Sequence, residues 1–488
     1  MFLINKNNSF HYEMENLLRV FFPNIKIIRQ EEKEEGEDFC LLALENEKIT
    51  IELKIGEEFY EREESFSASD KVFSESDDSF YERKMAVMLF CLLSEITSYT
   101  PPWGILTGVR PAKLMTKLRE AHGEEKAVDY FINELKVSED KTALALMVSK
   151  NETPIIDSSS PDSFSLYISI PFCPTRCSYC SFISHSNESA KKLIPEYVEK
   201  LCDEIKVTAS IAEEQKLKLE SVYIGGGTPT ALSAEQLKKV TDAISQSFDL
   251  SGVREYTIEA GRPDSITEEK FNVIKNSGAT RISINPQTFN DSVLKEIGRN
   301  HTSEQTISAF SLARKKGFDN INMDLIAGLP TDTFESFENT LDKAISLNPE
   351  NITVHTLALK RSSTLVTEGK RTNSAVLTKD MLTLVQKKLT QAGYEPYYMY
   401  RQSKSLGNLE NVGWAKKGYE GIYNVYMMEE RHTILSVGAG AVIKLKAPHT
   451  SEIERIYNYK YPYEYIGNFE EIISRKKHIG EFYSEFTI

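Results

Sequence analysis

No stretch of this 488-residue chain is apolar over the roughly 20 residues that a bilayer-spanning helix requires. The first residues lack the long apolar segment of a signal peptide. Basic residues are outnumbered, with 58 Lys and Arg against 72 Asp and Glu, and a net charge of −14 argues against a nucleic-acid backbone as partner. We therefore expect a cytoplasmic protein with no membrane and no nucleic acid among its partners.

Cysteine is scarce, and its six positions show no even pattern of the kind that a disulfide framework produces. Three cysteines lie apart from one another in apolar surroundings and are interpreted as core residues: Cys40, Cys91 and Cys202. The other three form a Cys-x3-Cys-x2-Cys run at Cys173, Cys177 and Cys180. In a reducing compartment, such a tight group indicates a metal site or a catalytic site.

The first 150 residues mix strand and helix patterns. Alternating apolar residues predict strands at 39–44 and 49–55. Apolar residues at helical spacing predict a helix at 80–93, and further helices are predicted at 124–135 and 141–148. A polar, turn-rich segment at 157–163 is the predicted linker. We therefore expect a separate N-terminal α+β domain at 1–150, for which the sequence indicates no function.

Beyond the linker, strand patterns alternate with helix patterns. Six apolar segments are predicted to be strands, each followed by a helix: 165–170, 221–224, 255–258, 281–284, 320–326 and 351–357. This alternation predicts a parallel sheet, and we expect an α/β fold with a partial (β/α)6 barrel over 161–395. Residues 396–488 are predicted to form a C-terminal region packed on the barrel.

An unusual sequence follows each predicted strand. In chain order these segments are the cysteine run, then 225–230, 259–264, 285–287, 324–330 and 355–361. The carboxyl ends of parallel strands meet at one edge of a barrel, where active sites lie. We therefore expect the six segments to surround one site.

Three thiolates can hold one metal centre and leave a coordination position open. One alternative is structural zinc, with His185 as the fourth ligand. The other is a four-iron cluster whose free iron binds the amino and carboxylate groups of a methionine moiety. Zinc would close the site and leave the polar residues at the other strand ends without a purpose, so the iron cluster is favoured.

The second strand end carries three consecutive glycines, Gly225 to Gly227, followed by Thr228 and Pro229. Glycines allow the backbone to approach a ligand and expose N–H groups to it. By themselves they are explained as well by a tight strand-to-helix turn. They have neither the GxGxxG spacing of a dinucleotide site nor the lysine of a phosphate-binding loop.

Taken together, these motifs resemble those of radical S-adenosylmethionine (SAM) enzymes, and more narrowly the oxygen-independent coproporphyrinogen III dehydrogenase group. The resemblance rests on the segment from Tyr167 to Cys180, on Gly-Gly-Gly-Thr-Pro at 225–229, on Asn-Pro-Gln-Thr-Phe at 285–289, on Ile-Gly-Arg-Asn-His at 297–301 and on Met-Asp-Leu-Ile-Ala-Gly-Leu-Pro at 323–330. It covers about 165–391. Gly-Val-Arg-Pro-Ala-Lys at 108–113, Glu-Ala-Gly-Arg-Pro-Asp at 259–264 and Glu-Asn-Val-Gly at 410–413 resemble a HemZ-like branch and extend it to most of the chain.

The resemblance implies a radical SAM barrel that binds a 4Fe–4S cluster and one SAM molecule, with residues for a second. Cys173, Cys177 and Cys180 would ligate the cluster. The residues implied around the first SAM are Tyr167, Gly226, Thr228, Gln287, Arg299 and Asp324. Those implied beside a second SAM are Gly225, Glu259 and Ala358. The catalytic assignments are Tyr167, Glu259 and Asp324. Taken alone, the polar residues at strand ends could equally be caps or loop hydrogen-bond partners.

The implied reaction is the oxidative decarboxylation of two propionates of coproporphyrinogen III to vinyl groups, in porphyrin biosynthesis. The implied partners are a tetrapyrrole substrate and an electron donor of the flavodoxin or ferredoxin type. Candidate cations for the propionates are Arg262, Lys360, Arg361 and Arg401. The aromatic stretch 394–400 would either face a macrocycle or, as we favour, pack between domains.

Two departures from the family pattern concern the substrate. Ser169 stands where the family typically has a histidine, and a hydroxyl cannot replace the charge of an imidazole. Ser181 and Phe182 follow the cluster run, where known dehydrogenases carry a further cysteine. Two other functions stay open: a haem chaperone with His355, His432 or His449 as axial ligand, and a methyltransferase that uses a second SAM.

Overall fold

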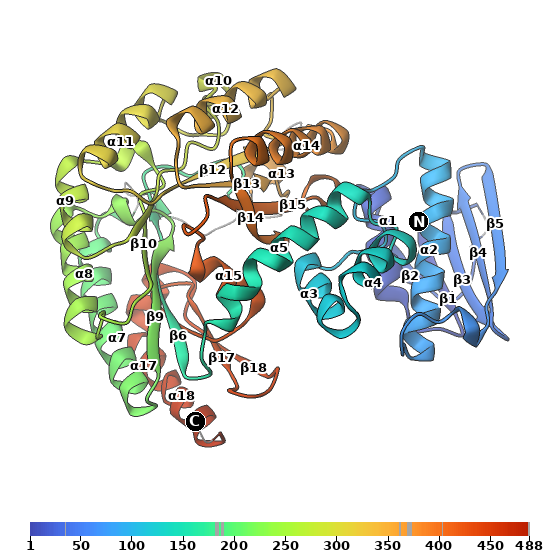
Figure 1. Ribbon diagram of the computed structural model, residues 1–488, viewed down its shortest axis with the longest axis horizontal. Helices are drawn as coiled ribbons and strands as arrows, with labels where there is room; N and C mark the ends of the chain where they lie inside the picture. The colour runs from blue at the N-terminus through green and yellow to red at the C-terminus, as the bar shows by residue number, and fades with distance from the viewer. Residues whose placement is uncertain are drawn as a thin grey trace. The chain divides into compact units, whose positions relative to one another are not determined.

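The computed structural model describes residues 1–34, 36–180, 185–186, 190–360, 363–367, 373–402 and 404–486 (Figure 1). They form two compact units, Met1–Leu146 with Arg401–Leu409, and Met147–Tyr400 with Glu410–Ile488. The division falls inside helix α5 (Glu139–Asp157). The polar segment predicted as a linker instead ends this helix and leads into the first strand of the second unit.

The first unit is built on a five-stranded sheet in the order β2-β1-β3-β4-β5. Its strands are β1 (Phe2–Lys6), β2 (Ile28–Gln30), β3 (Phe39–Glu45), β4 (Lys48–Ile55) and β5 (Glu58–Ser65). Its helical elements are α1 (His11–Phe21), η1 (Ala68–Asp70), α2 (Asp77–Thr97), α3 (Pro111–His122), α4 (Glu124–Asp129) and the π-helical turn η2 (Tyr130–Glu134). The 3-10 turn η5 (Leu406–Asn408) also belongs to it.

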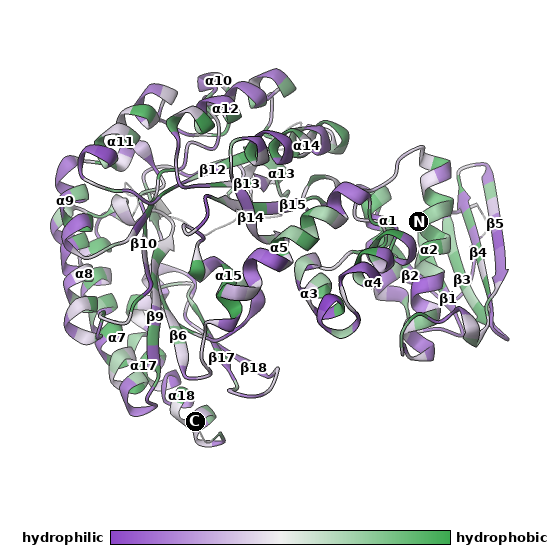
Figure 2. Cartoon of the chain, in the orientation of Figure 1, coloured by the Kyte–Doolittle hydropathy of each residue, from purple (hydrophilic) through white to green (hydrophobic). Residues whose placement is uncertain are grey.

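The core of this unit lies between the sheet and helices α1 and α2, where Leu17, Ile51 and Leu89 are buried. The alternation predicted at 49–55 is confirmed, because every second residue of β4 points into this core. The edge strand β5 is mostly hydrophilic (Figure 2). The single helix predicted at 124–135 is present as α4 and η2, which follow each other directly.

The second unit contains the six predicted strands as parallel neighbours. They are β6 (Ser163–Ile170), β9 (Lys218–Gly226), β10 (Glu255–Glu259), β11 (Arg281–Ser283), β12 (Ile321–Ala327) and β13 (Asn351–Thr356). The helices that follow them are α7 (Ile194–Glu214), α8 (Ala234–Ser247), α9 (Glu268–Asn276), α10 (Asp291–Glu296), α11 (Ser303–Lys315), α12 (Phe334–Leu347), α13 (Thr364–Thr367) and α14 (Ala375–Gln391). The sheet is open, so the predicted partial barrel is confirmed.

Local sequence explains these elements. Seven of the eight positions of β6 are buried, which is typical of a parallel strand covered on both faces. Helix α8 begins after Ser233, whose side chain accepts a hydrogen bond from the Gln236 N–H while the Gln236 side chain accepts one from the Ser233 N–H. Helix α12 ends at Asn348 in the left-handed conformation.

The C-terminal residues continue the barrel sheet beyond both of its edges. The strands are β14 (Glu395–Arg401), β15 (Glu410–Ala415), β16 (Thr433–Val437), β17 (Val442–Lys446) and β18 (Ile453–Tyr457). Strand β16 runs parallel to β6, and β15 runs antiparallel to β13. The helices are α15 (Ile422–Glu429), α16 (Pro462–Gly467), α17 (Phe469–Arg475) and α18 (Lys477–Ser484).

Short elements lie at the barrel edge that carries the motifs: β7 (Phe172–Cys173), β8 (His185–Ser186), η3 (Pro229–Ala231) and η4 (Pro263–Ser265). Within the described ranges, no helix combines the length and the hydrophobicity that crossing a bilayer requires.

Candidate active site at the carboxyl ends of the barrel strands

The cysteine run begins directly after β6 and is held against the glycine run at the end of β9. The N–H of Gly227 donates to the carbonyl of Ile170 at 2.7 Å, and the N–H of Thr228 donates to that of Phe172 at 2.8 Å. A Cβ atom on Gly227 would lie 2.6 Å from the Phe172 carbonyl oxygen. Only glycine therefore allows the two segments to approach this closely, which favours the packing explanation of Gly227 without excluding a ligand beside it.

Two cysteine sulfurs have polar neighbours. The Sγ atom of Cys173 lies 3.3 Å from the hydroxyl oxygen of Thr228. The guanidinium of Arg262 donates towards the Sγ atom of Cys177 at 3.8 Å and to the side chain of Thr175 at 2.9 Å. Donors around a sulfur stabilise negative charge on it. The strand-end residues Thr228 and Arg262 therefore line the cysteine run.

Arg262 is not a solvent-facing cation, because 3% of it is exposed and it is paired with Asp264 at 2.8 Å. Burial alone would raise the pKa of Asp264, but the hydrogen bonds and the charge of Arg262 outweigh it and lower that pKa. The interpretation of Arg262 as a cation for substrate propionates is therefore wrong. Its guanidinium is engaged by the loop that carries the cysteines.

Arg299, beside this loop, and Gln287, beside β12, each retain a polar atom without a partner. Arg299 donates to the carbonyl of Asn285 at 2.9 Å and to the hydroxyl of Tyr179 at 3.2 Å, but its Nε atom has no hydrogen bond. Gln287 has a φ of +68°, is buried, and leaves its Oε1 atom unpaired. Such buried unpaired atoms are costly unless a ligand satisfies them.

Glu259 and Asp324 are two neighbouring, half-buried carboxyl groups whose pKa values are shifted in opposite directions. Burial raises the pKa of Glu259 to about 7, and repulsion by Asp324 adds to this although the hydrogen bond from Tyr223 opposes it. Burial would also raise the pKa of Asp324, but interactions with His355 and Asn322 lower it overall. Two neighbouring carboxyls whose pKa values differ in this way can hold one proton between them near neutral pH.

Tyr167 belongs to a stack of three tyrosines beside this pair, in which Tyr423 is buried and Tyr167 and Tyr223 are half-buried. Its ring lies 6.2 Å from that of Tyr223 and 6.1 Å from that of Tyr423, and the last two rings are 4.5 Å apart. Tyr223 donates a hydrogen bond to Glu259. The sequence analysis missed Tyr223 and Tyr423. Tyr223 lies two residues before the glycine run, on the same face of β9 as Gly225, and this spacing was the available signal.

Asp324, which the sequence analysis placed both in the strand 320–326 and in the segment that follows it, lies within β12. Ala358 follows β13, is half-buried, and accepts a hydrogen bond from the Lys360 N–H. His185, Arg361, Ser181 and Phe182, on which sequence-based interpretations rested, lie outside the residues whose side chains are described.

The other sequence candidates have structural contacts. Arg401 is buried in the first unit, where it donates to the Leu106 carbonyl at 2.7 Å and packs over Trp103. His432 is buried with both ring nitrogens hydrogen-bonded, to Ser159 and Ser165, which makes it wrong as an axial haem ligand. His449 is exposed, and His355 is half-buried.

The aromatic stretch 394–400 packs inside the second unit, whereas the sequence analysis favoured packing between domains. It forms most of β14, and Tyr397 and Tyr398 are buried in a small cluster with Ala415 and Val425. The core interpretation of Cys40 and Cys202 is confirmed by their burial.

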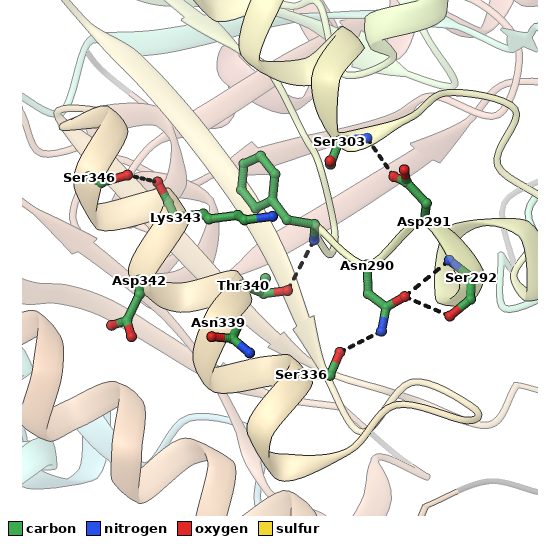
Figure 3. A pocket seen from close by; sticks show the side chains of 11 residues that line it. Asn290, Asp291, Ser292, Ser303, Ser336, Asn339, Thr340, Asp342, Lys343 and Ser346 are labelled. Atoms are coloured by element: carbon green, nitrogen blue, oxygen red, sulfur yellow. Dashed lines mark hydrogen bonds between the residues drawn. The ribbon is translucent and has the colours of Figure 1, made fainter.

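An open pocket of about 830 Å³ lies elsewhere on the barrel, lined by residues of α10, the start of α11 and α12 (Figure 3). Its polar groups largely satisfy one another. For example, the Asn290 amide donates to Ser336 at 2.7 Å, and Ser303 donates to Asp291 at 2.7 Å. None of the residues predicted for the active site lines it.

Comparisons with known proteins identify the class. The model of the radical SAM superfamily matches residues 167–344, which contain the cysteine run, the glycine run and the carboxyl pair. Among solved structures, coproporphyrinogen III oxidase (HemN) from Escherichia coli, described as a radical SAM enzyme, matches with a TM-score of 0.51 and 23% identity. That match covers 65% of this chain and 71% of that chain and supports the fold. The barrel and its motifs are those of a radical SAM protein.

The family follows from two curated relatives, of which the first matches over the full length. The oxygen-independent coproporphyrinogen-III oxidase-like protein HemZ of Bacillus subtilis is 34% identical over 99% of this chain and 98% of its own length. The haem chaperone HemW of Bacillus subtilis is 35% identical over 57% of this chain and 70% of its own. This chain belongs to the HemZ-like family of radical SAM proteins, as its motifs predicted.

Membership implies a 4Fe–4S cluster and SAM, and the side chains present fit both. Among the described residues, no three His, Cys, Asp or Glu side chains are gathered around a single ion position. A cluster does not require this, because each cysteine ligates a different iron atom. The three cysteines, the donors beside their sulfurs and the unpaired buried atoms of Gln287 and Arg299 form a donor set of the required chemistry.

Proposed function

We propose that this protein catalyses the oxygen-independent decarboxylation of coproporphyrinogen III. Each of two propionate side chains would lose CO2, one proton and two electrons and become a vinyl group, giving protoporphyrinogen IX. The observation that carries this proposal is the pair Glu259 and Asp324, which shares the barrel interior with Tyr167 and lies at the same end as the cysteine run. The name of the full-length relative, a coproporphyrinogen-III oxidase-like protein, supports the choice of substrate.

The proposed ligands of the cluster are Cys173, Cys177 and Cys180. Thr228 and Arg262 would stabilise the charge on their sulfurs, since both lie beside a cysteine Sγ atom. When bound, the cluster and SAM supply a carbon radical that removes a hydrogen atom from the substrate. The protein orients these groups and excludes water from them.

The proposed residues around the first SAM are Tyr167, Gly226, Thr228, Gln287, Arg299 and Asp324. The unpaired Oε1 atom of Gln287 can accept from an ammonium group, and the unpaired Nε atom of Arg299 can donate to a carboxylate. The carboxylate of Asp324 suits the positive sulfonium and the ribose hydroxyls. Gly225, Glu259 and Ala358 would border a second SAM.

Within this site we assign different roles to Glu259 and Asp324. Glu259, with its pKa near 7, can hold or release a proton during turnover at neutral pH. Asp324, with its pKa lowered, stays ionised and would fix the position of a cationic ligand. An electron donor of the flavodoxin or ferredoxin type and a cytoplasmic location complete the proposal.

A second candidate is a haem chaperone, because several relatives carry that name, including one that is 35% identical. Of the three histidines considered as haem ligands, His355 is the one that the structure leaves at the edge of the site. Its Nε2 atom lies 3.8 Å from Asp324, and its Nδ1 atom lies 3.4 Å from the hydroxyl of Tyr400. If His355 bound haem iron through either ring nitrogen, it would have to give up one of these contacts. The enzymatic function is therefore favoured over the chaperone.

The test is anaerobic reconstitution with iron and sulfide, followed by incubation with SAM, a reductant and coproporphyrinogen III. Formation of 5′-deoxyadenosine together with CO2 and vinyl product would support the proposal. Haem uptake without turnover would support the chaperone, and a methylated product a methyltransferase. Absence of 5′-deoxyadenosine with a fully loaded cluster would overturn the enzyme assignment.

A further inference from the structure

Ser169 lies at the junction of three segments that are far apart in the chain. On β6 it is the fourth residue before Cys173, and it pairs in register with Gly225 of β9. A Cβ atom on the next residue of that strand, Gly226, would lie 3.1 Å from the Ser169 hydroxyl. On its other side, this hydroxyl donates to the carbonyl of Ala439 at 2.8 Å, across 270 positions of sequence.

The third segment is the turn Gly438–Ala439, between β16 and β17. Tyr197, on α7, joins it to the same strand end: its hydroxyl donates to the Ser169 carbonyl at 2.8 Å and accepts from the Ala439 N–H at 2.9 Å. Gly438 has a φ of +95°, and a Cβ atom there would lie 2.6 Å from the Ser169 carbonyl oxygen. The turn therefore has room for no larger residue at this position.

A buried ion pair holds the turn from behind. Glu204 and Lys476 are both fully buried and lie 3.0 Å apart. Glu204 also accepts hydrogen bonds from the Gly438 N–H at 2.7 Å and from the hydroxyl of Tyr465 at 2.7 Å. Lys476 also donates to the carbonyl of Ser436 at 3.2 Å. A fully satisfied buried network of this kind is rigid and specifies one arrangement.

We propose that Ser169 is a positioning residue for the metal centre. Through Ala439 and Tyr197 it fixes the end of β6 to a turn that the Glu204–Lys476 pair holds, and it thereby sets where the cysteine run begins. Phe172 strengthens this link, because its ring packs edge-on against Tyr197 at 5.1 Å. The C-terminal strands are in this way part of the frame of the cluster site. The inference rests on the proposed cysteine ligands and is independent of the proposed substrate.

This role explains the residue type at position 169. Ser169 is 6% exposed, and its hydroxyl is hydrogen-bonded within the protein to the carbonyl of Ala439. The contacts of Gly226 and Gly438 leave no room for an imidazole beside it. We therefore assign Ser169 a structural role in holding the cysteine loop. The presence of serine where the family has histidine does not indicate a different proton-transfer chemistry.

The test compares Ser169→Ala with Ser165→Ala. Ser165 lies at the other end of the same strand, is also fully buried, and also hydrogen-bonds, to Ser221 and His432. Wild-type and variant proteins are reconstituted anaerobically and reduced. Three quantities are measured: iron per chain, the electron paramagnetic resonance spectrum of the reduced cluster without SAM, and the rate at which a chelator removes iron.

For Ser169→Ala we expect an altered resonance spectrum and iron loss about three- to tenfold faster than in the wild type, as for a lost buried hydrogen bond. Ser165→Ala should lower thermal stability but keep the wild-type spectrum and rate. Tyr197→Phe removes the hydroxyl that bonds both Ser169 and Ala439, and it should behave like Ser169→Ala. If Ser169→Ala does not fold, Tyr197→Phe serves as the test of the proposal. Wild-type spectra and rates in both Ser169→Ala and Tyr197→Phe would overturn the proposal. A wild-type protein that takes up no iron would instead contradict the proposed ligands themselves.

Discussion

Tyr223 on β9 donates a hydrogen bond to Glu259 on β10, so a phenol and a carboxyl share one contact in the barrel interior. Burial is the largest influence on the pKa of Glu259 and raises it to about 7. The tyrosine opposes this shift by stabilising the carboxylate. The two residues together set the pH at which the carboxyl gains its proton.

Replacing Tyr223 by Phe should raise the pKa of Glu259 further, because the hydrogen bond that favours the carboxylate is lost. The pH at which 5′-deoxyadenosine formation is half-maximal should therefore move upward, by about half a unit to one unit. The measurement is the pH profile of the rate under saturating SAM. Tyr256→Phe is the matched control, because the hydroxyl of Tyr256 is buried on β10 without a hydrogen bond. An unchanged profile in Tyr223→Phe would contradict the prediction.

Replacing Glu259 by Gln should change how stability depends on pH. Since the pKa of Glu259 is higher in the folded state than in the unfolded state, the folded wild type binds more protons between pH 4.5 and about 7. Its free energy of unfolding therefore falls as pH rises through this window. Glu259→Gln has no carboxyl to titrate, so its free energy of unfolding does not fall for this reason. Between pH 5 and pH 8 the variant should gain about 2 kcal/mol relative to the wild type, measured by urea unfolding of the apoprotein. The exposed Glu269→Gln should show no such gain.

Replacing Arg262 by Met should impair the metal centre. The change leaves Asp264 without its partner and removes the donor beside the Cys177 sulfur. We expect less than half of the wild-type iron per chain after reconstitution and a loss of stability of about 2 kcal/mol, since the buried half of a partly exposed ion pair is removed. Lys388→Met, which breaks an exposed pair with Asp342, is the control and should load iron normally. Normal iron loading in Arg262→Met would contradict the role assigned to the arginine.

Glu220 should govern acid stability at the opposite end of β6. Burial would raise its pKa, but His432, whose ring nitrogen lies 3.6 Å away, and the hydrogen bonds from Tyr426 and Arg254 lower it to about 2. This carboxylate therefore stabilises the fold above pH 4.5, and its contribution is lost as pH falls from 4.5 towards 2. Glu220→Gln should be less stable than the wild type at pH 7, with a difference that shrinks below pH 4. Thermal unfolding of both proteins between pH 2 and pH 7 measures this difference. A stability difference that does not change with pH would contradict the role assigned to the Glu220 carboxylate.

The barrel could be predicted because its signal is local. The apolar segment at 221–224 lies within β9, and the one at 320–326 matches β12 to within one residue at each end, since a strand buried on both faces must be apolar throughout. The C-terminal strands were harder to predict. Residues 433–445 read as one apolar run, yet the turn Gly438–Ala439 splits them into β16 and β17, and both strands pair within the barrel sheet.

Chain order and residue type determined which residues gather at the site, because parallel strands end at one edge whatever their exact length. Chain order was sufficient to predict that four features lie at the strand ends: the cysteine run, the glycine run, Glu259 and Gln287. Tertiary structure alone decided what each group does there: which carboxyl keeps its proton, that Arg262 faces a sulfur rather than solvent, and that Ser169 bonds a turn 270 positions away. Those properties depend on burial and on partners distant in sequence, and no local pattern contains either.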